Sequence, residues 1–144
     1  MSKYETPMTR WYWEQVRGTL VEEFYAVSGQ ADRGKRLLDA IIIHGGEHQI
    51  IRGRDFDRER IRGQDITIVQ SKAKRLGMYL MGQALFSRAL MEPFQPKSIL
   101  SVAVCSKDDA LLRPILEAHE GLKVVICPAT IVPPRVRRKP GLRG

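Results

Sequence analysis

The chain has 144 residues, of which 43% are hydrophobic and 28% charged, and its 24 Lys and Arg against 16 Asp and Glu give a net charge of +8. This length and composition are typical of one globular domain that buries its own core. No apolar run approaches the roughly 20 residues that cross a bilayer, and the N-terminus lacks the apolar core of a signal peptide. We therefore expect a cytoplasmic protein with no membrane partner, in which Cys105 and Cys127 are buried, reduced thiols.

The N-terminal half predicts one helix followed by three strands. Thr9 suits the N-cap of a short, aromatic-rich helix over residues 10–17, which ends at Gly18. Residues 19–27 also fit a continuing helix, but their β-branched and aromatic content between two glycines favours a strand. The other two strands are expected over residues 36–43 and 65–71, with a brief strand extension at 49–51 and a charged loop over 52–63.

The C-terminal half predicts alternating helices and strands. Helices are expected over residues 76–91 and 107–119, and strands over 98–105 and 123–127. A strand-helix-strand unit implies a parallel pair with a right-handed crossover. The chain therefore predicts an α/β fold of three layers, in which a mixed sheet is flanked by helices in the order α-β-β-β-α-β-α-β. This domain is expected to span residues 1–128.

A basic, proline-rich tail is expected over residues 129–144. Its cations are Arg135, Arg137, Arg138, Lys139 and Arg143. Prolines around them favour an extended, solvated segment. Such a tail either keeps the protein soluble or makes sequence-independent contacts with phosphates.

The polar residues of greatest interest interrupt two apolar strands. Asp39 is set into the strand over residues 36–43, and Gln70-Ser71-Lys72 ends the strand that begins at residue 65. Because side chains alternate along a strand, Gln70 and Lys72 share one face. Burying a lone carboxylate, amide and ammonium is costly unless they meet each other, a metal or a ligand. If the two strands are neighbours, all three groups can converge on one site.

These residues and the order of elements resemble the PD-(D/E)XK nuclease superfamily, which includes restriction endonucleases, Holliday-junction resolvases and repair nucleases. The resemblance implies a restriction-endonuclease-like fold over most of the chain, with Asp39 as a ligand of Mg²⁺ or Mn²⁺. Gln70 stands at the family's Glu position, and the carbonyl of Ser71 is the implied backbone ligand. Lys72 matches the lysine that positions or activates the attacking water. The residue before Asp39 is Leu38, where the family often has Pro.

The resemblance also implies a further carboxylate from the first helix and contacts to phosphates. Glu14 is the candidate on that helix, and Glu22, in the segment after Gly18, is a second one. The neutral Gln70 is a weaker ligand than Glu, which raises the value of a further carboxylate. Substrate contacts are expected from Lys74, Arg75, Gln83 and Arg88, although a solvated helix face explains these four equally well.

The sequence thus supports three functions from different classes. The first is a magnesium-dependent nuclease, with Asp39, Gln70 and Lys72 as catalytic residues and DNA as the expected nucleic acid. The second is an inactive nucleic-acid-binding module of the same fold. The third is a structural or interaction protein in which the polar trio is a buried ion pair. A homodimer is compatible with each of them.

Overall fold

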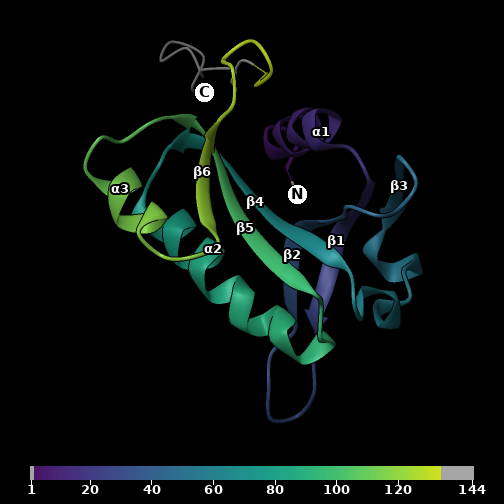
Figure 1. Cartoon of the computed structure of the whole chain (residues 1–144). Helices are drawn as coiled ribbons and strands as arrows, with labels where there is room; N and C mark the ends of the chain where they lie inside the picture. The colour runs from purple at the N-terminus through teal and green to yellow at the C-terminus, as the bar shows by residue number, and fades with distance from the viewer. Residues whose placement is uncertain (1, 134–144) are drawn as a thin grey trace, which may run out of the picture.

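A six-stranded sheet runs through the centre of the computed structural model, which describes residues 2–133 (Figure 1). Helices lie on both of its faces, so the expected α/β architecture with a mixed sheet is confirmed. The elements in chain order are α1 (Glu5–Val16), β1 (Thr19–Val27), β2 (Arg36–Ile43), β3 (Gln49–Arg52), η1 (Gly53–Asp55), η2 (Arg58–Ile61), β4 (Asp65–Arg75), α2 (Met78–Met91), η3 (Glu92–Phe94), β5 (Ser98–Lys107), α3 (Leu112–Glu117) and β6 (Leu122–Ile126).

The strands are ordered β3-β1-β2-β4-β5-β6 across the sheet. β1, β2 and β4 form an antiparallel meander. β4, β5 and β6 are parallel, because α2 and α3 carry the chain back between them. The short β3 pairs with β1 in parallel and forms one edge of the sheet.

The two faces of the sheet are covered by different helices. α1 packs Met8, Tyr12 and Trp13 against one face, where Ile42 and Val69 lie. On the other face, the side chains of α2 and α3 pack against the apolar residues of β5 and β6. The meander strands add a third apolar cluster on that same face, closed by aromatic residues from η3 and the loop after β3. The helices therefore each bury one apolar face, whereas the central strands β2, β4 and β5 are buried on both faces.

Three elements, α1, β4 and α3, differ most from the sequence prediction. α1 begins at Glu5 and not after Thr9, because the Thr9 hydroxyl is buried against the Ser71 hydroxyl at 2.8 Å and does not cap a helix. β4 continues to Arg75, where it still pairs with β5. The helix expected over residues 107–119 is only Leu112–Glu117, because β5 extends to Lys107 and Asp109 then caps a turn through its carboxylate.

Both cysteines are free and buried, as expected, and burial raises the pKa of each thiol to about 11. Among the helices of residues 2–133, none combines the length and the apolar character that spanning a membrane requires. Most of the predicted basic tail lies outside the described residues, including Arg135, Arg137, Arg138 and Lys139.

Candidate functional site

β2 and β4 separate at the position where the sequence places its polar residues. Their pairing ends at Ala40 and Val69. Beyond this point β2 stays paired with β1 as far as Arg36, while β4 stays paired with β5 as far as Arg75. The facing edges of the two strands therefore lack their usual ladder of hydrogen bonds, and their backbone groups need other partners.

Asp39 fills the first part of this opening. Its Oδ2 accepts a hydrogen bond from the backbone N–H of Ser71 at 2.9 Å, and its own N–H donates to Oε1 of Gln70 at 3.2 Å. Burial raises the pKa of the Asp39 carboxyl above its usual value, and the negative charge of Glu5 acts in the same direction. The Ser71 N–H and the Lys72 charge oppose that shift. The surroundings of the carboxyl therefore disfavour its charged form.

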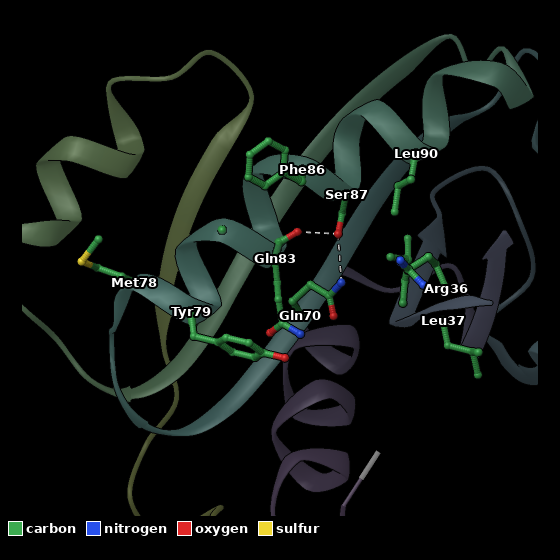
Figure 2. Close-up of a pocket in the computed structure, with 11 residues that line it drawn as sticks. Arg36, Leu37, Gln70, Met78, Tyr79, Gln83, Phe86, Ser87 and Leu90 are labelled. Carbon is green, nitrogen blue, oxygen red and sulfur yellow. Dashed lines mark hydrogen bonds between the residues drawn. The ribbon is translucent and has the colours of Figure 1, made fainter. Parts of the chain in front are cut away.

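Gln70 joins both sides of the opening through its amide and is only 3% exposed. Its oxygen accepts from the Asp39 N–H, and its Nε2 donates to the Ser87 hydroxyl on α2 at 3.0 Å. That hydroxyl in turn donates to the carbonyl of Gln83, as Figure 2 shows. An amide can both accept and donate, whereas an ionised carboxylate can only accept. The structure therefore gives a physical reason for Gln at this position.

Glu5 is a site residue that the sequence prediction missed. It lies in the first turn of α1, and its Oε2 accepts from the backbone N–H of Ala73 at 3.2 Å. The amides of Ser71 and Ala73 are two residues apart on β4, or roughly 7 Å. The carboxylates of Asp39 and Glu5 are thus held along the same edge of β4, one from β2 and one from α1.

A helix-start motif marks Glu5 in the sequence. The Ser2 hydroxyl accepts from the backbone N–H groups of Tyr4 and Glu5, and it donates to the other oxygen of the Glu5 carboxylate. Ser-x-x-Glu is the spacing of a capping box. This signal was available in residues 2–5.

Lys72 lies on the same face of β4 as Gln70. Its positive charge favours the ionised form of Asp39, and its ammonium nitrogen lies 5.7 Å from the centre of the Tyr79 ring. With Lys74 and Arg75 it lines a pocket of about 320 Å³ beside the opening. The structure therefore brings together Asp39, Gln70, Ser71 and Lys72, as the sequence predicted.

The two other predicted carboxylates lie elsewhere. Oε2 of Glu14 lies 3.4 Å from Nε2 of His48, whose ring stacks on that of Trp13. Glu22 accepts two hydrogen bonds of 2.9 Å from the guanidinium of Arg10. Each already has its own partner away from Asp39, and Glu5 occupies the place beside Asp39 that was predicted for Glu14 or Glu22.

The predicted substrate-contacting residues divide into two groups. Lys74 is exposed beside Lys72, and Gln83 lines a groove next to Gln70. Arg75 and Arg88 donate to the backbone carbonyls of Asp108 and Glu120 respectively, so both connect neighbouring segments. Arg75 still lines the basic pocket, whereas Arg88 lies against Gly121 on another side of α2.

The donor chemistry of the opening fits a hard divalent cation. Oδ2 of Asp39 and Oε2 of Glu5 are each held by a backbone amide, which orients the two carboxylates. The carbonyl of Ser71 points to the same side as its N–H, by the geometry of a strand. Residues 2–133 contain no group of three His, Cys, Asp or Glu side chains that could hold a metal. Magnesium, however, is commonly bound by one or two carboxylates while it retains several waters.

Comparison of the chain with protein-family models, with curated proteins and with solved structures gives no match. The chemistry of the opening between β2 and β4 is therefore the basis for a proposed function.

Proposed function

We propose that the protein is a metal-dependent nuclease, which hydrolyses phosphodiester bonds of nucleic acid, with DNA as the expected substrate, at the opening between β2 and β4. One observation carries the proposal. The carboxylates of Asp39 and Glu5, from different elements, are anchored on the amides of Ser71 and Ala73, on either side of Lys72 in the chain. The order of α1, the β1-β2-β4 meander, α2 and β5 supports a restriction-endonuclease-like fold, with β3 as an added edge strand.

The residues of the opening have distinct roles in this proposal. Asp39 and Glu5, with the carbonyl of Ser71, would hold Mg²⁺ or Mn²⁺. Such an ion polarises a phosphoryl oxygen and lowers the pKa of a bound water. Gln70 keeps the backbone of Asp39 in place through the bond from its N–H. Lys72 supplies an ammonium for the charge that develops on the phosphoryl oxygens, a contribution that is largest in the transition state.

The test compares matched variants of the full chain on plasmid, branched and single-stranded DNA. Wild type is expected to cleave with Mg²⁺ and to stop when the ion is chelated. Asp39→Asn, Glu5→Gln and Lys72→Ala are each expected to lower the rate by about 100-fold or more, as loss of an electrostatic catalytic group does. Glu14→Gln makes the same chemical change on the same helix and should leave the rate unchanged. The proposal fails if wild type shows no metal-dependent cleavage, or if Glu14→Gln is as damaging as Glu5→Gln.

A second candidate is a nucleic-acid-binding module without catalysis, and the environment of Gln70 favours it. The side chain at this position is neutral, and both ends of its amide are already hydrogen-bonded within the protein. Binding that weakens steeply with salt, without cleavage of any substrate in Mg²⁺ or Mn²⁺, would establish this function in place of the first.

A further inference from the structure

A groove of about 460 Å³ runs between the beginning of β2 and the outer face of α2, next to the proposed nuclease site (Figure 2). Met78, Tyr79 and Phe86 line it and are 77%, 73% and 71% exposed, and Leu37 lines its β2 side. α2 buries other residues against the sheet, namely Leu80, Ala84, Ser87 and Met91. The exposed apolar side chains therefore contribute little to the core, and a groove of this size suits a small flat ligand.

The polar groups of the groove could recognise such a ligand. The amide of Gln70 and the hydroxyl of Ser87 lie along it but are already bonded to each other. Gln83 lines the same groove, and no hydrogen bond joins its side-chain amide to another of residues 2–133. This amide offers one acceptor and two donors. Its hydrogen-bonding capacity matches the edge of a nucleobase.

A basic pocket adjoins the apolar groove, and Tyr79 belongs to both. Lys72, Lys74 and Arg75 line this second pocket, which has a volume of about 320 Å³. The ammonium of Lys72 lies 5.7 Å from the centre of the Tyr79 ring. Apolar, aromatic walls next to a cluster of cations complement a flat base attached to phosphates. An apolar peptide or a second copy of the chain would fill the groove but would leave the cations without a counter-charge.

We propose that this groove binds an unpaired nucleobase of a single-stranded nucleic acid, while Lys72, Lys74 and Arg75 contact the adjoining phosphates. Tyr79 and Phe86 supply the surfaces on which the base stacks, and Gln83 bonds to its edge. A paired base is enclosed in the duplex stack, so only a single-stranded, frayed or flapped segment can enter. This inference rests on the proposed function, because it names the substrate class of the proposed nuclease site.

Binding without metal separates the inference from catalysis. The anisotropy of labelled single strands of DNA and of RNA, and of a DNA hairpin of matched composition, is titrated with the full-length chain in a chelator. A single strand carrying 2-aminopurine reports stacking through quenching of its emission. Tyr79→Ala and Phe86→Ala are each expected to weaken single-strand binding by about 5- to 100-fold and to reduce the quenching. Tyr79→Phe keeps the ring and should retain both. The difference in affinity between the DNA and the RNA single strands shows whether the site accepts deoxyribose, ribose or both.

Leu111→Ala is the matched control, because Leu111 is 72% exposed but lies at the start of α3, outside the lining of the groove. It should bind within about twofold of wild type. Equal affinity for single strand and hairpin would overturn the inference. Wild-type binding by both alanine variants would also overturn it. The inference would also be overturned if the protein formed a dimer and Phe86→Ala dissociated it without changing nucleic-acid binding. The occupant of the groove would then be a second copy of the chain.

The proposed nuclease and the proposed base site can fail independently. Single-strand binding that depends on Tyr79 and Phe86, without metal-dependent cleavage, would refute the nuclease and support the base site. Cleavage whose kcat/KM is the same in wild type, Tyr79→Ala and Phe86→Ala would support the nuclease and refute the base site.

Discussion

β2 and β4 meet in two different ways along their length. From Ala40 to Ile43 and from Ile66 to Val69 they are joined by main-chain pairs, and these residues are almost fully buried. Beyond Asp39 and Gln70 the strands separate, and hydrogen bonds from side chains take the place of the ladder. The same two strands thus provide an apolar core in one half and polar side-chain groups in the other. A substitution in each half should therefore change a different property.

The largest expected effect on stability lies in the paired half. Ile41 is fully buried in the apolar cluster opposite Ile68. Ile41→Ala should lower the free energy of unfolding by about 2–5 kcal/mol, because it leaves a cavity. Asp39→Asn should change it by no more than about 1 kcal/mol, since the amide oxygen can still accept from Ser71. Urea unfolding of both variants measures the contrast. A larger cost for Asp39→Asn would indicate that the opening is a structural ion-pair site.

Gln70 tests how the opening is held together. Gln70→Leu should cost about 1–3 kcal/mol of unfolding free energy, because the part-buried N–H of Asp39 loses its acceptor and the buried hydroxyl of Ser87 loses its donor. Gln70→Glu keeps an acceptor for this N–H but places a further carboxylate beside Asp39, so it should be less stable than wild type without metal. Thermal unfolding with and without Mg²⁺ is the measurement. The metal should raise the Tm of Gln70→Glu by more than that of wild type, and equal shifts would exclude a role for position 70 near the ion.

The pH dependence of stability should change when Asp39 is replaced. Burial raises the pKa of this carboxyl from its ordinary 3.8, so the folded protein holds the proton more tightly than the unfolded chain. Its contribution is therefore fully present below pH 3.8 and is lost as the pH rises through the raised pKa. Asp39→Asn has no carboxyl to ionise at this position and does not lose this contribution. Its free energy of unfolding relative to wild type should therefore increase as the pH rises.

Urea unfolding across the acidic to neutral range, with and without Mg²⁺, gives that difference. The ion should restore stability to wild type at neutral pH and leave Asp39→Asn unaffected, because ligand binding to the folded state stabilises it. A stability difference that stays constant with pH would contradict the assignment of the raised pKa to Asp39.

The smallest expected effect concerns the basic pocket. Lys74 is exposed at the end of β4, so Lys74→Ala should leave stability nearly unchanged. It should weaken binding to all nucleic-acid sequences alike and reduce the slope of log affinity against log salt by about 1. Lys123→Ala removes an exposed lysine from β6 and serves as the control. A slope that falls equally in both variants would mean that only net charge matters.

The strands were predictable because their signals are local. The apolar, β-branched runs around Ile41 and Ile68 identify two strands whatever lies beside them, and side-chain alternation places Gln70 and Lys72 on one face. The separation of β2 from β4 was not predictable, because it depends on how β1 and β5 hold the strands apart. The hydrogen bonds that fill the opening join Asp39 to Ser71 and Glu5 to Ala73, which are far apart in the sequence.

The choice of carboxylate on α1 shows why the site was only partly predictable. With Thr9 as the expected N-cap, the helix was predicted to start after Glu5. In the structure the hydroxyl of Thr9 instead forms a hydrogen bond with that of Ser71. Glu14 is nine residues beyond Glu5, and at 3.6 residues per turn it lies on the opposite side of the helix, roughly 13 Å along the axis. Once the start of the helix is known, its periodicity selects Glu5 over Glu14.

The hydrogen bonds that link Ser87, Gln70 and Asp39 have a consequence for regulation. They connect α2, which forms one wall of the groove, to the backbone that carries the carboxylate. If the groove and the metal site act as proposed, a ligand that displaces α2 should alter the surroundings of Asp39, and an ion held by Asp39 should alter the affinity of the groove by the same factor, since coupling between two sites is reciprocal. Single-strand affinity and Mg²⁺ affinity would then form a thermodynamic cycle, and Ser87→Ala should weaken the coupling because it removes the acceptor of the Gln70 amide.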